Sequence, residues 1–317
     1  MGEFELIEHF FRRPTRRNAL GVGDDCALLA PARGMQLAVS CDMLLEGRHF
    51  LPTVDPFKLG HKALAVNLSD LAACGAKPLA FTLALALPEP DETWLEPFSR
   101  GLFALADEHG CELVGGDTTR GPLNICITIF GEVPPGAALL RSGARAGDDI
   151  YVSGTLGDAR LALEILRGTA SASPQVFEAA RARMEQPTPR VALGQALRHV
   201  ASSAIDLSDG LLGDLGHILR ASGVGAAIDT AVASSLMQAD LGLDDEQKLE
   251  YVLAGGDDYE LAFTAAVSQR DAVRAAAEAA LTPVTRIGRV EAQQGLRLLD
   301  AQGRAIERHY VSFDHFA

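Results

Sequence analysis

Six short segments of this chain place one or two aspartates at the edge of an apolar run or inside it. They read "GVGDDCALL" at 21–29, "VSCDMLLEG" at 39–47, "VNLSDLAAC" at 66–74, "LVGGDTTRG" at 113–121, "AIDLSDGLL" at 204–212 and "LAGGDDYEL" at 253–261. A lone aspartate after a strand usually forms a turn or caps a helix. Aspartates that converge repel one another and need bound cations. The fold must therefore either scatter these carboxylates or gather them around metal ions.

Asp70 is the aspartate that a turn or a cap explains least well. It lies inside a segment of helical spacing, 55–76, three residues after Asn67, so the two polar side chains share a helix face. An ionised carboxylate among core residues is costly unless it is paired or bound to a metal. Lys62 and Lys77 lie too far along the helix to pair with it directly. We therefore expect a cation from outside the chain at this position.

A shared metal site would use oxygen ligands only. The candidate carboxylates are Asp24 or Asp25, Asp42, Asp70, Asp117, Asp206 and Asp209. Oxygen ligands suit Mg²⁺ or Ca²⁺ rather than zinc. Mg²⁺ is commonly shared between carboxylates and substrate phosphates, so this set favours nucleotide chemistry.

Composition narrows the class of protein. A chain of 317 residues with 48% hydrophobic residues and a mean hydropathy of +0.11 has room for two well-buried domains. A net charge of −14 argues against nucleic-acid binding. No apolar run reaches the roughly 18–20 residues of a membrane span, and the N-terminus does not have the pattern of a signal peptide. Five scattered cysteines without a C-x-x-C pair fit a reducing compartment, so we expect a cytoplasmic protein without a membrane partner.

The order of apolar patterns favours an α/β or α+β architecture. We expect strands at 35–42, ending on Asp42, and at 79–88, 124–133 and 150–154. We expect helices near the N-terminus, at 55–76, at 159–168 and at 268–281, the last capped by Ser268. Residues 134–149 are the candidate linker, with Asp148 and Asp149 as turn residues, and 169–175 is an expected loop. Asp158 and Asp209 precede expected helices and suit helix caps.

Several familiar nucleotide-binding and catalytic motifs are absent. There is no G-x-x-x-x-G-K-[ST], no H-R-D kinase set, no H-E-x-x-H and no G-x-S-x-G, and "GVGDDC" lacks the third glycine of a dinucleotide fingerprint. The turn at 155–158 opens a helix and offers N–H groups to an anion, with Arg141 and Arg145 nearby in sequence. ATP chemistry in this chain would depend on carboxylates and metals.

Across nearly its whole length the chain resembles the thiamine-monophosphate kinases. The matching motifs, in order, are "GVGDDCALL", "SCDMLLEGRHF", "HKALAVNLSDLAACGAKP", "VGGDTTRGP", "LRSGARAGDDIYVSGTLGDA", "SAIDLSDGLLGDLGHI", "AGGDDYELAFT" and the terminal "YVSFDHFA". This family is related to aminoimidazole ribonucleotide synthetase and selenophosphate synthetase. The resemblance implies two such domains, at 1–137 and 138–317, with N-terminal sheets pairing in a homodimer. It also implies direct transfer of the γ-phosphoryl of ATP to thiamine monophosphate, assisted by several Mg²⁺ ions.

The resemblance also implies roles for individual residues. The positions that match magnesium ligands are Asp25, Ser40, Cys41, Asp42, Asp70, Asp117, Asp206 and Asp209, of which Asp42, Asp70 and Asp209 are the expected catalytic set. The positions that match ATP contacts are Gly116, Asp117, Arg141 and Ser208. The positions that match substrate contacts are His49, Asp257 and Phe313. Two positions depart from the family pattern: Cys41 stands where threonine is common, and Asp257 where glutamate is common.

Three alternative functions can be compared with this one. A sibling enzyme of the superfamily would activate another acceptor, although a selenophosphate synthetase would need a reactive residue earlier than the first cysteine, Cys26. An aspartyl-phosphate enzyme would need a D-x-D motif after a strand, whereas "DLSDG" separates its acids by three positions. A sensor of thiamine phosphates would bind Mg²⁺ and ATP without turnover.

Overall fold

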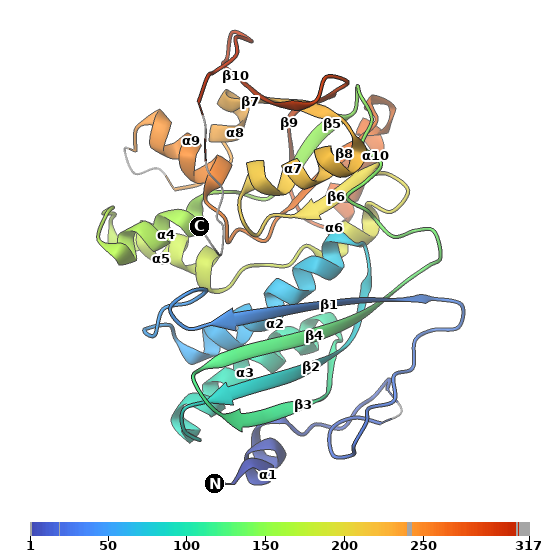
Figure 1. Cartoon of the computed structure of the whole chain (residues 1–317), viewed down its shortest axis with the longest axis vertical. Helices are drawn as coiled ribbons and strands as arrows, with labels where there is room; N and C mark the ends of the chain where they lie inside the picture. The colour runs from blue at the N-terminus through green and yellow to red at the C-terminus, as the bar shows by residue number, and fades with distance from the viewer. Residues whose placement is uncertain (1, 19, 240–242, 309, 311–317) are drawn as a thin grey trace. The chain divides into compact units, whose positions relative to one another are not determined.

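The computed structural model describes residues 2–18, 20–239, 243–308 and 310 of the chain. The chain divides into two compact units, Met1–Leu71 with Ala76–Gly136, and Ala72–Gly75 with Ala137–Ala317 (Figure 1). Both units combine a sheet with helices, which confirms the predicted α/β class. Within the described part of the chain, no helix is both long and apolar enough to cross a bilayer.

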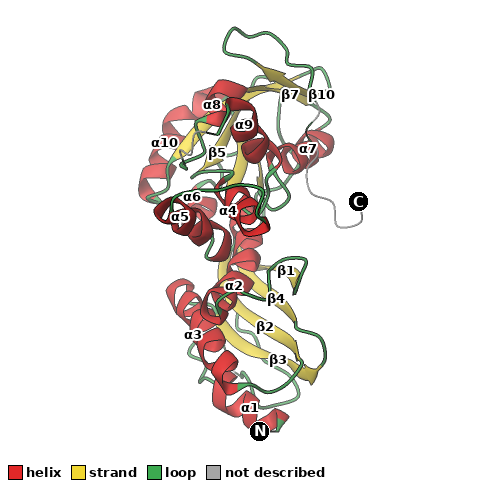
Figure 2. Ribbon diagram, turned by 90° about the vertical axis from the view of Figure 1, so that its left-hand side faces the viewer, coloured by secondary structure: helices red, strands yellow, loops and turns green. Residues whose placement is uncertain are grey.

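The N-terminal unit is a four-stranded sheet covered by helices on one face. Its strands are β1 (Gln36–Leu45), β4 (Asn124–Val133), β2 (Lys77–Leu87) and β3 (Glu112–Arg120), in the order β1-β4-β2-β3. The first two pairings are antiparallel, and β2 with β3 is parallel. The helices α2 (Pro56–Ala73) and α3 (Glu92–His109) lie on the same face of the sheet (Figure 2). A short α1 (Glu3–Leu6) and η1 (Ile7–Phe11) form the expected N-terminal helix.

Two glycines allow α2 and α3 to approach closely. A Cβ on Gly60 would lie 2.0 Å from the carbonyl oxygen of Phe98, and a Cβ on Gly101 would lie 1.9 Å from that of Phe57. Real Cβ atoms do not tolerate such distances, so the two helix backbones are in contact at this crossing. The crossing fixes α2, the helix that carries Asp70, against α3.

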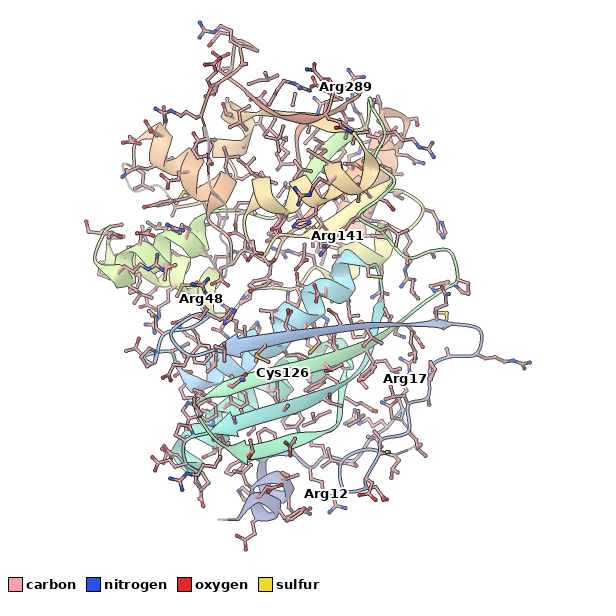
Figure 3. All side chains as sticks on the ribbon, viewed as in Figure 1. Arg12, Arg17, Arg48, Cys126, Arg141 and Arg289 are labelled. Carbon is pink, nitrogen blue, oxygen red and sulfur yellow. The ribbon has the colours of Figure 1, made fainter. Side chains whose placement is uncertain are left out.

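The opposite face of this sheet, here called the outer face, carries none of the helices described in this unit (Figure 2). On β1 the odd-numbered side chains point to it, and Leu37, Val39 and Met43 are 47%, 59% and 49% exposed. Cys126 of β4 lies on the same face (Figure 3). Apart from a small cluster where Leu29 packs near Ala80, the β1 side of the outer face is open and apolar.

The C-terminal unit is built on a six-stranded sheet. Its strands are β10 (Gly295–Leu299), β7 (Gly225–Asp229), β9 (Val284–Glu291), β5 (Asp149–Ser153), β8 (Leu261–Ala265) and β6 (Ser203–Asp206), in this order. Its helices are α4 (Asp158–Arg167), α5 (Pro174–Glu185), α6 (Val191–Ala196), α7 (Leu211–Ser222), α8 (Thr230–Ser234), α9 (Asp245–Ala254) and α10 (Arg270–Ala279), with a 3-10 turn η2 (Val267–Gln269). Val152, Leu156, Leu215 and Val252 belong to one large apolar core.

Several predicted boundaries were wrong. The strand β1 does not end on Asp42 but continues to Leu45, because its alternation of inward and outward side chains continues. Ser268 lies in the 3-10 turn and does not cap α10. The expected loop at 169–175 is shorter, since Ser173 already caps α5.

Four aspartates have different local roles from those predicted. Gly157 and Gly210, not Asp158 and Asp209, are the N-caps of α4 and α7. The pair Asp148 and Asp149 is buried rather than part of an exposed linker turn.

Candidate functional site

The N-terminal unit brings three predicted residues together at the contact of β1 with α2. The side chains of Ser40 and Asp42 point from alternate positions of β1 toward the helices. The Ser40 hydroxyl donates a hydrogen bond to Asp70 Oδ2. The backbone N–H of Asp42 donates to Asn67 Oδ1 at 3.2 Å, and Asn67 Nδ2 donates to the Ala63 carbonyl at 3.0 Å. Asp70 is half-buried rather than enclosed in the core, so its carboxylate lies at the edge of the unit with oxygen donors beside it.

The thiol of Cys41 points away from this group. Its sulfur lies 3.5 Å from that of Cys126 on the outer face, and the Thr128 hydroxyl donates to it at 3.5 Å. Burial raises the pKa of the Cys126 thiol to about 11, and the neighbouring Cys41 adds to the rise. Only the backbone carbonyl of Cys41 remains as a possible metal ligand beside Asp42.

Gly116 and Asp117 lie on β3, three strands away from β1. In the sheet register Asp117 lies opposite Ala84 of β2, Ala84 lies opposite Cys126 of β4, and Cys126 lies opposite Met43 of β1. Side chains in register with one another point to the same face of a sheet, so Asp117 belongs to the outer face. Asp117 is exposed and is therefore not brought beside Asp42 within one chain. Gly116 has φ 148°, and a Cβ there would lie 1.8 Å from the Leu83 carbonyl oxygen, so this position requires glycine.

The loop that carries Asp25 is anchored at its base. The Glu112 carboxylate accepts hydrogen bonds from the backbone N–H groups of Arg16, Arg17 and Asn18 at 2.7, 2.9 and 3.1 Å. Burial raises the pKa of Glu112, but these hydrogen bonds outweigh that effect and lower it overall. The Asn18 side chain then accepts from the Ala30 N–H at 3.2 Å. Asp25 itself is exposed at the tip of this loop.

His49 follows β1 in a tight turn. Its Nδ1 accepts a hydrogen bond from the Leu45 N–H at 3.0 Å. That bond fixes the ring on the turn and identifies Nδ1 as an unprotonated ring nitrogen. The predicted substrate residue Phe313 lies outside the described residues.

In the C-terminal unit, Asp206, Ser208 and Asp209 follow one another at the end of β6. Asp206 is the last residue of the strand and is buried, whereas Ser208 and Asp209 are half-buried in the turn before α7. Asp214 of α7 reaches back to this turn, and its Oδ2 accepts from the N–H groups of Ser208 and Asp209, each at 3.0 Å. Burial raises the pKa of Asp214 to about 7, although these hydrogen bonds oppose the rise and the charge of Asp209 adds to it.

Asp257 is joined to the same turn through the backbone. The antiparallel pairing of β6 with β8 continues beyond the strands, with Tyr259 N–H donating to the Leu207 carbonyl at 2.8 Å and Asp257 N–H to the Ser208 carbonyl at 2.7 Å. Asp257 has φ 65°, a left-handed conformation that aspartate tolerates better than most residues. The candidate ATP residue Ser208 and the candidate substrate residue Asp257 are therefore direct neighbours.

A buried ionic cluster lies next to this pairing. The side chain of Glu260 is fully buried and accepts from Arg190 Nε at 2.6 Å, from Arg183 Nη2 at 2.7 Å and from the Ser153 hydroxyl at 2.6 Å. Since a carboxylate in the interior is stable only when its partners are complete, this cluster fixes the backbone of the 257–260 segment.

Arg141 is exposed near α7 (Figure 3). Its carbonyl accepts from the Ser222 hydroxyl at 3.4 Å, and the same hydroxyl accepts from the Gly143 N–H at 3.1 Å, which docks this loop on the end of α7. His217 of α7 lies 3.1 Å from Arg220, between Nδ1 and Nη2. Burial lowers the pKa of His217, and the charges of Arg220 and Arg141 lower it further. Basic groups therefore gather on this side of α7.

Two N–H groups of the turn at 155–158 already have partners within the protein. The Gly157 N–H donates to the buried Asp258 carboxyl at 3.0 Å, and the Leu156 N–H donates to the Leu236 carbonyl at 3.2 Å. Burial raises the pKa of Asp258 well above its usual range. The carboxyl group of Asp158 also lies at this helix start, where its negative charge opposes an anion, and the phosphate role of this turn stays a prediction.

The donor chemistry of both groups suits Mg²⁺. The N-terminal unit presents Asp42 and Asp70 at the contact of β1 with α2, and the C-terminal unit presents Asp206 and Asp209 close together in the chain. Hydroxyl or carbonyl oxygens accompany both pairs. Among the described residues no three His, Cys, Asp or Glu side chains form a ready metal-binding group. Mg²⁺ typically uses one or two carboxylates and takes its remaining ligands from phosphates and water, so two carboxylates per unit fit its needs.

The sequence did not indicate the contacts that Asp214, Glu260 and His217 make near the predicted residues. Asp214 had one available signal, a charge inside the apolar pattern of "DGLLGDLGHI". Glu260 had none, because its partners Arg183 and Arg190 lie about 70 residues earlier in the chain and only the fold brings them together.

Comparison with known proteins matches both halves of the chain. The model of the N-terminal domain of AIR synthase related protein matches residues 23–133, and that of the C-terminal domain matches residues 145–301. The thiamine-monophosphate kinase of Salmonella typhimurium is 48% identical over 322 residues, which cover 100% of this chain and 98% of the relative.

Solved structures are similar over most of the chain. The crystal structure of a thiamine-monophosphate kinase from Stenotrophomonas maltophilia superposes with a TM-score of 0.83 and 49% identity, covering 92% of both chains. A structure described as AaThiL complexed with AMPPCP and TMP superposes with a TM-score of 0.76 and 29% identity, covering 99% of this chain and 96% of that one. The similarity therefore extends through both units.

Proposed function

Because this chain belongs to the thiamine-monophosphate kinase family, we propose that it transfers the γ-phosphoryl group of ATP to thiamine monophosphate, giving thiamine diphosphate and ADP. The observation that carries the proposal is full-length identity of 48% to a kinase of this name, together with a similar structure that binds an ATP analogue and TMP. The resemblance noted in the sequence is thereby confirmed. We expect the enzyme to act in the cytoplasm, with domains at 1–137 and 138–317.

The proposed reaction needs little covalent chemistry from the protein. An oxygen of the acceptor phosphate attacks the γ-phosphorus, a new P–O bond forms, and the bond to the β-phosphate oxygen breaks with ADP as the leaving group. Since the acceptor phosphate is already ionised at neutral pH, no strong general base is required. The main tasks of the enzyme are to position two anions and to neutralise their charge.

We assign the metal-binding part of these tasks to oxygen ligands. The proposed ligands are Asp25, Ser40, the Cys41 carbonyl, Asp42, Asp70, Asp117, Asp206 and Asp209. When bound, Mg²⁺ would neutralise the phosphates and orient them for direct in-line transfer. The hydrogen bond from Ser40 supports the role of Asp70, because it orients a carboxylate that lies at the edge of the unit.

The remaining predicted residues would hold the two substrates. Arg141 would contact the ATP phosphates as a bidentate donor, with Gly116 and Ser208 as further ATP contacts. Asp257 and His49 would contact thiamine monophosphate. The expected role of Phe313 as a stacking partner of the thiamine rings stays a prediction, since that residue is not among those described.

The test is a chromatographic assay of the purified protein with ATP, Mg²⁺ and thiamine monophosphate, run beside free thiamine and aminoimidazole precursors. We expect thiamine diphosphate and ADP in equal amounts from thiamine monophosphate only. Product from another acceptor would indicate a sibling activity, and binding of ATP without any product would indicate a sensor.

We also propose a homodimer that pairs the outer faces of two N-terminal sheets. The support is the open apolar side of β1, where Val39 and Met43 are about half exposed in one chain although large apolar patches are rarely left open to water. Light scattering should give twice the chain mass for the wild type and a single chain mass for Val39→Asp. A wild-type monomer at micromolar concentration would contradict this assembly.

A further inference from the structure

Asp214 is a buried carboxyl group whose hydrogen bonds go to a turn outside its own helix. Its side chain is 5% exposed, and its Oδ2 accepts from the N–H groups of Ser208 and Asp209. Both donors precede Gly210, the N-cap of α7. The N–H of Gly210 also bonds to this carboxyl group, so Asp214 holds both the N-cap of the helix and the segment that enters it.

The segment held in this way contains two proposed site residues. With its N–H fixed by Asp214, Ser208 presents its carbonyl oxygen to the N–H of Asp257 at 2.7 Å. The next donor in the turn, the N–H of Asp209, is fixed by the same oxygen of Asp214. One carboxyl group is thus linked to the proposed metal ligand Asp209, to the proposed ATP contact Ser208 and, through one peptide unit, to the proposed acceptor contact Asp257.

The surrounding backbone leaves this turn little freedom to find other partners. Gly210 has φ 114°, and a Cβ on it would lie 3.0 Å from the backbone of Ala254. A Cβ on Gly256 would lie 2.8 Å from the Ser208 carbonyl oxygen. The turn is packed between these two backbones, so an amide that loses Asp214 would lose its protein partner in a half-buried turn.

We propose that Asp214 is a positioning residue that sets the geometry of the donor and acceptor sides of the reaction together. The inference rests on the proposed function, because it assigns Asp214 to the turn that this function uses. Asp214 does not touch the substrates; it acts through Ser208 and Asp209. A displacement of about 1 Å in such a turn costs on the order of 100-fold in rate.

The experiment compares Asp214→Ala with a control of the same chemistry in the same unit. Asp229 caps α8, and its Oδ1 accepts from the N–H groups of Ala231 and Val232 at 3.0 and 3.1 Å. Asp229→Ala therefore also deprives two backbone amides of a carboxylate, but at a helix with no part in the proposed site. Asp214→Asn, which keeps an acceptor oxygen, is the conservative variant.

The readouts are kcat and KM for both substrates and the binding of AMPPCP with Mg²⁺ measured by calorimetry. In Asp214→Ala we expect kcat/KM to fall about 100-fold and the affinity for the Mg²⁺–AMPPCP complex to fall about 10-fold or more. Asp214→Asn should recover most of both losses, and Asp229→Ala should match the wild type in both. Equal kinetics and binding in Asp214→Ala and Asp229→Ala would overturn the proposal.

A replacement variant and an independent binding measurement keep the proposal testable. If Asp214→Ala does not fold, Asp214→Glu replaces it, since the longer side chain keeps an acceptor but displaces the turn; wild-type kcat in that variant would overturn the proposal. If the wild type makes no thiamine diphosphate, the proposed function fails. The calorimetric comparison of Asp214→Ala with Asp229→Ala still decides whether Asp214 positions the nucleotide site.

Discussion

The clearest energetic prediction concerns Glu260, whose carboxylate is fully buried against two arginines. Its oxygens accept from Arg190 Nε at 2.6 Å and Nη2 at 2.5 Å, and from Arg183 Nη2 at 2.7 Å. The side chains of Arg183 and Arg190 are only 19% and 15% exposed. In Glu260→Gln an NH₂ group replaces one acceptor oxygen, so a donor faces donors and the arginine charges lose their counter-ion.

Breaking a buried ion pair by removing one partner costs about 3–5 kcal/mol. For a unit of this size, 3 kcal/mol lowers Tm by about 6–12 °C. Calorimetry and urea unfolding of the full chain measure the change in the C-terminal transition. The control is Asp271→Asn, whose pair with Arg274 is 89% and 69% exposed and contributes at most about 0.5 kcal/mol. A loss of less than about 1 kcal/mol in Glu260→Gln relative to this control would refute the reasoning.

Three further predictions concern the N-terminal sheet, acid stability and the metal. Gly116→Ala should destabilise the sheet by at least about 1–3 kcal/mol from backbone strain. Gly115→Ala should not, because a Cβ there would make only an ordinary contact with Thr82 Cγ2 at 3.8 Å; equal Tm values would contradict this. Hydrogen bonds from Arg270 lower the pKa of Asp149, so its contribution to stability is present above the ordinary carboxyl pKa of about 4 and is lost as the pH falls below it. Asp149→Asn should flatten the fall of Tm below about pH 4, and an unchanged slope would contradict it. EDTA should abolish turnover and leave the circular dichroism spectrum unchanged, with full recovery on addition of Mg²⁺; persistent turnover in EDTA would exclude the metal role.

The periodic elements could be predicted from the sequence because their signals are local. The strand at 124–133 has the predicted bounds, and the helix at 55–76 and the strand at 79–88 agree within a few residues. The alternation of β-branched residues and the apolar face of a helix depend on neighbours only a few positions away. These elements place Asp70 beside β1, which the sequence pattern indicated only as an unpaired charge.

The roles of buried charges could not be predicted, since their partners are distant in the chain. Asp149 was interpreted as a linker turn residue, but the fold brings Arg270 and Arg286 to it from more than 120 positions away. The turn at 155–158 has the pattern of an anion site, yet the Asp258 carboxyl, about 100 positions later, already uses its Gly157 N–H. A short motif specifies a local shape but not the groups that fill it.

In the candidate site, too, the local motifs could be predicted from the sequence, whereas the partners of the site residues could not. The resemblance identified Asp42, Asp70 and Asp209 by motif, and the structure adds the groups that hold them, Asn67 and Asp214. The family departure at position 41 also gains a physical meaning, because the thiol lies on the outer face and leaves the ligand set without a side chain there.

Asp70→Asn tests the assigned metal role with little risk to the fold. The substitution keeps an acceptor for the Ser40 hydroxyl but removes the charge that we assign to metal binding. We expect turnover to fall by at least about 100-fold with an unchanged Tm. Ser99→Ala on α3 is a suitable control, since its hydroxyl bonds to the Glu96 carbonyl in its own helix. Near-normal turnover in Asp70→Asn would remove it from the proposed ligands.

The most direct test of the central claim is a rapid-quench experiment with ATP labelled at the γ-phosphate. The wild-type protein would be mixed with labelled ATP, Mg²⁺ and thiamine monophosphate, and protein and small molecules would be separated at each time point. We predict that the label passes into the terminal phosphate of thiamine diphosphate in step with ADP formation, and that the protein remains unlabelled throughout. Label on the protein before product, or ADP without labelled thiamine diphosphate, would contradict direct phosphoryl transfer.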